Sequence, residues 1–126
     1  MYSHIVVGAN DIAAAKKFYD SVMGALGYPE GNLIGDRVIY SGEAGMLMVT
    51  KSYDGNEATF GNGVTIGFNA ATPNVVDSFH ASGLAAGGSD DAAHHGAPGL
   101  GQSCHEAPED SCDAYLPDQE LARDIR

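Results

Sequence analysis

The chain is poor in cysteine and has no long apolar run. Its two cysteines, Cys104 and Cys112, lie in one irregular region, so no disulfide framework can be read from their spacing. The longest apolar run is far too short to span a bilayer. The first residues also lack the basic segment and the long apolar core of a secretory signal. We therefore expect a cytoplasmic protein without a membrane partner.

Basic residues are scarce as well. Six Lys and Arg residues stand against 17 Asp and Glu residues, which gives a formal net charge of −11. Nucleic-acid phosphates need a basic surface, so this composition argues against a nucleic-acid partner. An acidic protein can attract cationic ligands or metal ions, although simple solubility explains the same charge.

Length and composition fit one globular domain. The 126 residues are 44% hydrophobic and 18% charged, which is a globular balance rather than a disordered one. A chain of this length can bury a core without disulfides or a structural metal. We therefore expect residues 1–126 to form a single domain.

The first residues, YSHIVVGAND at 2–11, predict a strand with two different faces. Side chains alternate along a strand, which places Ile5 and Val7 on one face. The opposite face carries Tyr2, His4 and Val6. That second face is either dry core or the wall of a site.

A helix follows this strand. Asn10 or Asp11 can cap it by accepting a hydrogen bond from a free amide group. Apolar residues recur at helical spacing: Ile12, Ala15, Phe18 or Tyr19, Val22 and Leu26. The opposite, polar face carries Lys16, Lys17 and Asp20. Gly27 stands where a helix C-cap is expected.

The rest of the chain repeats this order. Residues 36–42 and 45–52 predict two strands in a hairpin, and residues 64–70 predict a third strand. Thr72 and Pro73 form a typical helix start, and that helix is expected to end near Gly83 or Gly87. No element is predicted over 88–113, a strand follows at 113–118, and the last residues form a short helix or a frayed tail. Two modules, about 1–60 and 61–126, follow from this repeat.

Four stretches resemble proteins of the glyoxalase/bleomycin resistance type, in the vicinal oxygen chelate superfamily. They are HIVVGANDIAAAKKFYDSVMGALGY, YDGNEATFGNGVTIGFNA, VVDSFHASGLAAGG and GAPGL, which together cover roughly residues 1–101. The resemblance implies an α+β fold of paired βαβββ modules that form a curled mixed sheet around a cavity. The C-terminal region is atypical, so we expect the second module to be shortened.

Glyoxalase-type members of this superfamily hold a divalent metal through ligands from four strands. On this chain the first ligand matches His4, whereas the next two positions fall on Met48 and Thr65. The fourth, a glutamate after an Asp-Pro-Asp-Gly turn, has no counterpart, and Glu120 is the nearest acid. A catalytic metal needs three or more protein ligands. The resemblance therefore implies a degenerate metal site in which His4, with Glu120 as a substitute, is the candidate for Zn, Ni, Fe or Mn.

Other residues allow several interpretations. His4 could bind a metal, contact a ligand or line a cavity wall. His105 follows the GAPGL segment and is a candidate for the cavity mouth. The spacing of the histidines and cysteines between 94 and 112 matches no compact metal motif. An apolar pocket and simple core packing explain a further set equally well: Tyr2, Tyr40, Met46, Met48, Tyr53 and Phe60.

Three functions are compatible with these residues. The first is a small-molecule binding protein whose ligand contacts are His4, Thr65, Met48, Tyr40 and His105, with an acidic surface that favours a cationic compound. The second is a divalent-metal-dependent lyase or isomerase of the glyoxalase type, in which the metal polarises vicinal oxygens. The third is a folded interaction module without a ligand. Each is compatible with a homodimer, because an incomplete module leaves sheet edges that a second copy can cover, with exchange of elements as one route.

Overall fold

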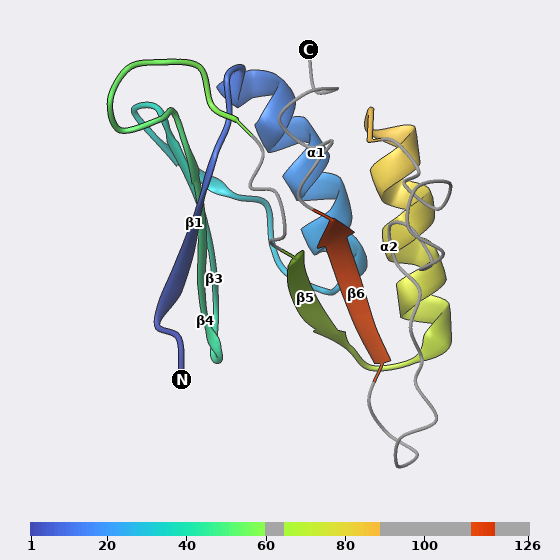
Figure 1. Ribbon diagram of the computed structural model, residues 1–126. Helices are drawn as coiled ribbons and strands as arrows, with labels where there is room; N and C mark the ends of the chain where they lie inside the picture. The colour runs from blue at the N-terminus through green and yellow to red at the C-terminus, as the bar shows by residue number, and fades with distance from the viewer. Residues whose placement is uncertain (60–64, 89–111, 118–126) are drawn as a thin grey trace.

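The computed structural model describes residues 1–59, 65–88 and 112–117, and these segments form two helices and two β-sheets (Figure 1). The elements in chain order are β1 (His4–Gly8), α1 (Ile12–Ala25), β2 (Asn32–Ile34), β3 (Arg37–Gly42), β4 (Gly45–Thr50), β5 (Thr65–Ala70), α2 (Pro73–Ala85) and β6 (Cys112–Pro117). None of the described helices is long and apolar enough to cross a membrane.

The first module is a complete βαβββ unit. Its strands form a four-stranded mixed sheet in the order β1-β4-β3-β2, with β1 parallel to β4 and the other pairs antiparallel. In the second module the described elements are β5, α2 and β6, and its two strands pair antiparallel as a separate small sheet. The α+β class with a curled, unclosed mixed sheet is therefore confirmed.

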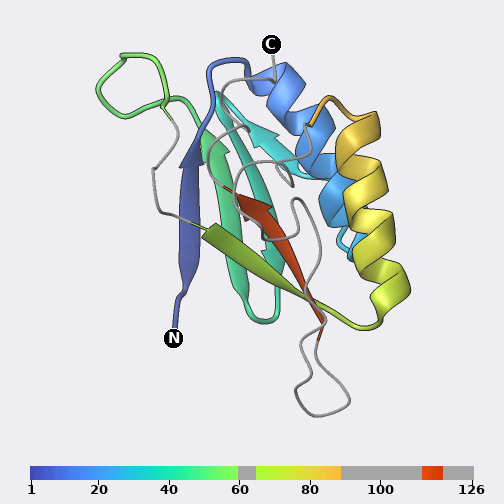
Figure 2. The same ribbon diagram turned by 45° about the vertical axis from the view of Figure 1, so that its right-hand side comes forward.

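The two sheets and the helices form layers. Both helices and the β5-β6 sheet lie on one side of the four-stranded sheet, as Figures 1 and 2 show from two directions. We call that side of the four-stranded sheet its inner face, and the opposite side its outer face. The two helices also pack against each other.

The alternation predicted for the first strand is confirmed. Ile5 and Val7 pack against the core on the inner face, whereas His4 and Val6 are exposed on the outer face. In β4 the register partners of Ile5 and Val7 are Leu47 and Val49, and both are buried. The main core consists of Ala9, Ala15, Phe18, Tyr19, Val22, Met23, Val38, Tyr40, Leu47, Val49 and Phe79.

The helix ends follow the sequence signals. Of the two candidate caps for α1, Asp11 accepts the hydrogen bond, from the amide of Ala14 at 3.0 Å. Thr72 caps α2 by accepting from the amide of Val75 at 3.3 Å. After α1, Gly27 adopts a φ of 94°, a left-handed conformation that ends the helix without steric cost. Gly87, with a φ of 101°, follows the end of α2, so the later of its two predicted end points is the correct one.

Asn10, the other candidate cap, binds a distant segment instead. Its side-chain oxygen accepts from the amide of Ala58 at 2.6 Å, and its side-chain nitrogen donates to the carbonyl of Ala58 at 3.3 Å. This pair of hydrogen bonds attaches the 51–59 connection to the end of β1.

Two features of the structure do not follow from the sequence pattern. Lys16 and Asp20 lie on the polar face of α1, yet their side chains are only 25% and 21% exposed. They are covered because the turn before β2 and the strand β3 pack against this side of α1. The strand β2 was also missed, because its three residues are all exposed and show no alternation. The segments 89–111 and 118–126, on which no element and a short helix or tail were predicted, lie outside the described residues.

Candidate functional site

A pocket of about 320 Å³ lies between the inner side of the four-stranded sheet and β5. It is found at the end of the sheet where β1 begins and where the β3-β4 hairpin turns. Its lining residues are Met1, Tyr2, His4, Ile5, Met23, Tyr28, Tyr40, Gly42, Ala44, Gly45, Met46, Leu47, Ile66, Gly67, Phe68 and Asn69. Both modules therefore contribute walls to it.

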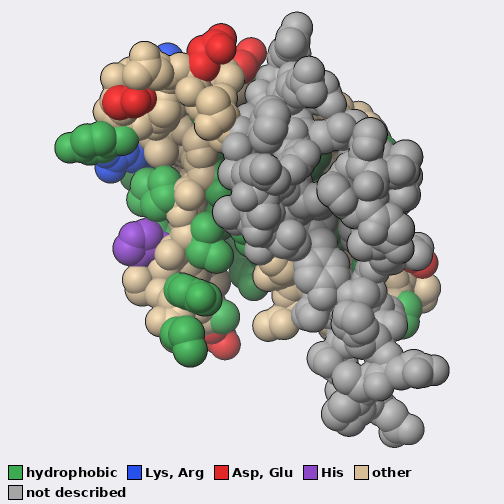
Figure 3. All heavy atoms as spheres, viewed as in Figure 1, with side chains coloured by type: hydrophobic (Ala, Val, Ile, Leu, Met, Phe, Trp, Pro, Cys, Tyr) green, Lys and Arg blue, Asp and Glu red, His purple; other side chains and the backbone are tan. Residues whose placement is uncertain are grey.

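The position of β1 explains why residues of both sheet faces line this pocket. Among the described elements β1 pairs with β4 alone, so no described strand pairs with its other edge. A pocket at the first residues of an edge strand can reach His4 on the outer face as well as Ile5 on the inner face. Figure 3 shows hydrophobic side chains gathered on this side of the molecule, with a histidine beside them.

The pocket walls are mainly aromatic and thioether groups. The described lining residues include the six-membered rings of Tyr2, Tyr28, Tyr40 and Phe68 and the methionines Met1, Met23 and Met46. No Asp, Glu, Lys or Arg side chain occurs among the described lining residues. The polar side chains of the described lining residues are phenol, imidazole and carboxamide groups, which fits the usual composition of a small-molecule site.

Two of the rings are held by neighbouring rings. Phe68 packs against Phe79, which is fully buried, with ring centroids 6.1 Å apart and planes at 42°. Tyr40 packs against buried Tyr19 at 6.2 Å and 43°. Aromatic pairs at these distances attract each other beyond simple area burial, so these two walls are fixed before any ligand arrives.

The ring of Tyr28 lies against the backbone of Gly42. A Cβ added at Gly42 would stand 2.5 Å from Cε1 of Tyr28, closer than side-chain carbons ever approach. Glycine at this position therefore lets the ring lie against the end of β3. This contact shapes one wall of the pocket.

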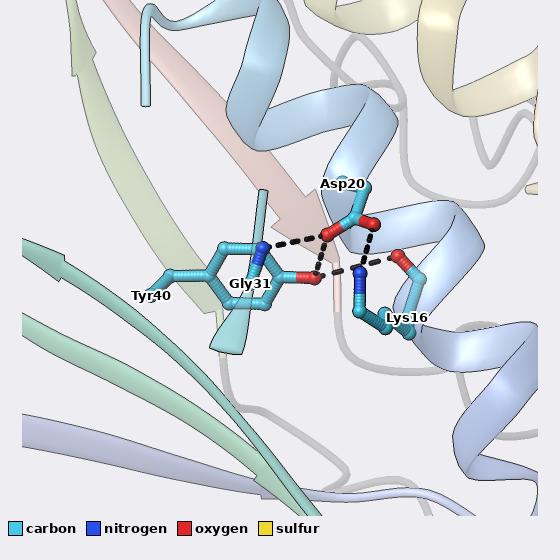
Figure 4. A network of polar contacts seen from close by, with 4 residues as sticks. All are labelled: Lys16, Asp20, Gly31 and Tyr40. Carbon is cyan, nitrogen blue, oxygen red and sulfur yellow. Dashed lines mark hydrogen bonds and ion pairs between the residues drawn. The ribbon is translucent and has the colours of Figure 1, made fainter. Parts of the chain in front are cut away.

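The hydroxyl of Tyr40 is already engaged inside the protein (Figure 4). It donates to Oδ1 of Asp20 at 2.8 Å, and the amide of Gly31 donates to the same oxygen at 2.8 Å. The ammonium of Lys16 lies 2.5 Å from Oδ2 of Asp20. Tyr40 is 3% exposed and its hydroxyl already binds Asp20. Its ring can therefore contact a ligand, but its hydroxyl does not orient the ligand by hydrogen bonding.

This network changes the ionisation of both partners. Burial raises the pKa of Tyr40 above its ordinary value, and the hydrogen bond to the Asp20 carboxylate and the charge of that carboxylate raise it further. Partial burial alone would raise the pKa of Asp20, but hydrogen bonds from Lys16, Gly31 and Tyr40 outweigh burial and hold that pKa below its usual value. Asp20 is therefore a carboxylate and Tyr40 a neutral phenol around neutral pH.

A comparison with solved structures identifies the family. The chain is similar to a crystal structure of a glyoxalase/bleomycin resistance protein from Albidiferax ferrireducens T118, with 45% sequence identity and a TM-score of 0.69. The match covers 71% of this chain and 72% of that one. The chain belongs to the glyoxalase/bleomycin resistance protein family. The resemblance seen in the sequence is thereby confirmed, although no protein-family model and no curated protein matches the chain.

The structure places predicted site residues of this glyoxalase/bleomycin resistance protein on both faces of the four-stranded sheet, and two of them, His4 and Tyr40, line the pocket. Tyr40 lies on the inner face, whereas His4 and Met48 lie on the outer face. His4 of β1 is the register partner of Met46 in the neighbouring strand β4, and Val6 is the partner of Met48 two residues further along each strand. The imidazole Nδ1 of His4 is 2.8 Å from the hydroxyl oxygen of Ser3. As site residues, all three stay predictions.

The remaining predicted site residues are less fully placed. Thr65 is the first residue of β5 and its register partner is Pro117. His105 and Glu120 lie outside the described residues. Of the six residues for which an apolar pocket was one interpretation, the pocket wall includes Tyr2, Tyr40 and Met46.

Several lining residues were not recognised as site candidates. Met23, Tyr28 and Asn69 line the pocket, and the sequence pattern predicts no ligand role for them. The available signal was the alternation in β5, which places the carboxamide of Asn69 on the strand face opposite Ile66 and Phe68.

The described residues do not by themselves fit the divalent metal of a glyoxalase-type site. Within the described part of the chain, no group of three or more His, Cys, Asp or Glu side chains could hold a metal ion. Met48 supplies no oxygen or imidazole ligand beside His4. A metal-dependent lyase therefore lacks a ligand set among the described residues, and that activity stays a prediction from the sequence.

Proposed function

We propose that this glyoxalase/bleomycin resistance protein binds a small organic molecule in the pocket between β5 and the four-stranded sheet. The observation that carries the proposal is the pocket itself, which has a volume of about 320 Å³ and aromatic, thioether and polar groups in its walls. Ligand sites in proteins are mostly apolar concavities with a few polar groups, from roughly 300 Å³ upward. The ligand is therefore compact.

The charge of the protein selects among compact ligands. No lysine or arginine side chain among the described lining residues offers a permanent cation to a carboxylate or a phosphate. The whole chain carries a formal charge of −11, which repels anions at long range and attracts cations. Tyrosine rings can also accept a cation on their faces. The proposed ligand is thus neutral or cationic, and a cationic compound gains from the acidic surface.

Three probes of one skeleton test this proposal. Titration calorimetry with the full chain compares quinoline, its N-methylquinolinium cation and its carboxylate quinaldate near neutral pH. We expect saturable binding of the first two and at least about tenfold weaker binding of quinaldate, which corresponds to about 1.4 kcal/mol.

A pocket-filling variant supplies the control. Ala44→Phe places a ring in the pocket wall and should abolish binding of quinoline, whereas Ala13→Phe, at an exposed position of α1, should leave it unchanged. Binding that survives Ala44→Phe would place the ligand elsewhere. No saturable binding of any of the three probes would count against the proposed function.

A further inference from the structure

We infer that the pocket selects a flat aromatic molecule with a hydrogen-bond donor and an acceptor next to each other on one edge of its ring. The side-chain amide of Asn69 forms hydrogen bonds with both of these groups. The inference rests on the proposed function, because it names the chemical class of ligand for the same pocket. It goes beyond charge and size to the shape of the ligand and to the residue that determines specificity.

The pocket walls favour a flat ring over a saturated one. Tyr28 and Phe68 present rings from opposite modules, and Phe68 is held in place by buried Phe79. Met23 and Met46 add thioether sulfurs, which contact aromatic rings favourably. An aromatic ligand gains from ring pairs and from sulfur contacts, whereas a saturated ligand of equal size gains only from burial.

Asn69 is the polar group suited to orient such a ligand. It is an exposed residue in the wall of the pocket, and its side chain makes no hydrogen bond within the described part of the chain. Its backbone pairs with Asp113 in β6, so the strand holds the residue in position. A carboxamide offers one acceptor and two donors side by side. It is therefore complementary to a cyclic amide, whose N–H and C=O lie next to each other.

The other polar groups of the pocket are less suited to this role. The hydroxyl of Tyr40 is engaged by Asp20, and Nδ1 of His4 is engaged by Ser3. The hydroxyls of Tyr2 and Tyr28 and Nε2 of His4 can each add one contact, but none of them presents a donor and an acceptor side by side as a carboxamide does. Specificity for the edge of the ligand thus falls to Asn69.

Three lactams test the inference by titration calorimetry on the full chain. Isocarbostyril has a flat bicyclic ring and a free N–H and C=O edge. N-methylisocarbostyril keeps the ring and loses the donor, and the octahydro analogue keeps the lactam and loses the aromatic ring. We expect isocarbostyril to bind about tenfold more tightly than either of the other two, because each lacks one of the two contributions.

Variants at asparagine positions test the role of Asn69. Asn69→Leu should weaken isocarbostyril binding about tenfold and weaken N-methylisocarbostyril binding by a smaller factor, because the methylated lactam keeps only its carbonyl acceptor. Asn74→Leu, at an exposed position of α2 that is not a lining residue, should leave both unchanged. Circular dichroism and thermal unfolding show whether each variant is folded.

The outcomes separate this inference from the proposed function. Equal binding of the octahydro analogue overturns the preference for a flat ring, and an unchanged affinity in Asn69→Leu overturns the role of Asn69, while pocket binding stands in both cases. Binding of quinoline without binding of isocarbostyril overturns the inference alone. Failure of the lactams together with all three quinoline probes overturns the proposed function with it.

Discussion

Asp20 joins three segments that are distant in the sequence. Its carboxylate accepts from Lys16 one helical turn earlier, from the amide of Gly31 before β2 and from the hydroxyl of Tyr40 in β3. The buried phenol of Tyr40 and this amide both depend on that one carboxylate. Removing it leaves the amide of Gly31 without its acceptor and leaves the hydroxyl of Tyr40 only the carbonyl of Lys16 at 3.4 Å. An unsatisfied buried polar group is more costly than a missing hydrogen bond.

The first prediction concerns the stability of Asp20→Ala. We expect the free energy of unfolding to fall by about 2–3 kcal/mol, because several charge-assisted hydrogen bonds are lost together. Urea unfolding followed by circular dichroism measures the change. Lys17→Ala, at the exposed neighbouring position, should stay within about 0.5 kcal/mol of the wild type. Equal effects of the two substitutions would contradict the importance of Asp20.

The second prediction concerns pH. The pKa of Asp20 is lower in the folded protein than its ordinary value of 3.8, so the folded state binds fewer protons than the unfolded state in this range. The stability contributed by Asp20 is therefore fully present above that ordinary value and is lost as the pH falls through the lower, folded pKa.

Asp20→Asn tests this dependence because it removes the titrating group and keeps the size of the side chain. We expect its free energy of unfolding, measured in urea between neutral and acidic pH, to decline less on acidification than that of the wild type. Parallel pH profiles of the two proteins would show that the network around Asp20 does not contribute to acid sensitivity.

At the scale of elements, the chain just before β2 approaches β3 without room for a side chain. A Cβ added at Gly31 would stand 2.4 Å from Cγ1 of Val38 and 2.5 Å from Cζ of Tyr40. Both of these side chains are buried in the core, so neither can move aside freely. The third prediction is that Gly31→Ala lowers the free energy of unfolding by about 1–3 kcal/mol through overpacking.

A second glycine provides the matched control for Gly31→Ala. Gly24 lies in the last turn of α1, and a Cβ added there meets nothing within 4 Å. Gly24→Ala should stabilise the protein by roughly 0.5–1 kcal/mol, because alanine is the better helix former. Thermal and urea unfolding of the two variants should therefore move in opposite directions, and a shift in the same direction would contradict the close approach at Gly31.

Elements whose cause is local could be predicted from the sequence. The alternation in β1, the cap at Asp11 and the Thr72-Pro73 start of α2 depend on neighbouring residues alone, and all are found in the structure. The strand β2 could not be predicted from its own residues, because all three are exposed and show no alternation. They are extended because they pair with β3. Lys16 and Asp20 are likewise covered by residues that are distant in the sequence. Gly31 and Tyr40, which bind Asp20, lie 11 and 20 positions after it.

The candidate site was predictable only in part, for the same reason. The pocket includes Tyr2, Tyr40 and Met46, for which a pocket was one interpretation of the sequence. Tyr28 and Asn69 belong to different modules, and only the packing of β5 near the four-stranded sheet makes them walls of one pocket. Alternation assigns a residue to a face, but it does not say which distant element covers that face.

At the scale of the whole molecule, the sequence predicts a homodimer, and β1 provides a specific way to test it. Among the described elements β1 pairs on one side only, and its residues HIVVG include none of the lysines or prolines that protect edge strands. A strand edge can pair with its own copy about a twofold axis, so we propose that the second copy joins here.

The fourth prediction is tested by sedimentation velocity, which measures the oligomeric state. The wild type should be a dimer. Val6 is 51% exposed on the outer face of β1, and Val6→Lys, which places a charge there, should shift the equilibrium toward monomer. Leu84→Lys, on the exposed side of α2, should leave the dimer intact. A wild-type monomer at the highest soluble concentration would contradict the proposal.

The central claim is that the pocket between β5 and the four-stranded sheet binds a ligand, and an amide NMR titration of the full chain with quinoline tests it most directly. We predict saturable shifts at Phe68 and Asn69 of β5 and at Gly42 and Met46 of the β3-β4 hairpin, with one common affinity. These residues come from both walls of the pocket. Absence of saturable shifts, or shifts confined to Val6 and Met48 on the outer face, would contradict the account.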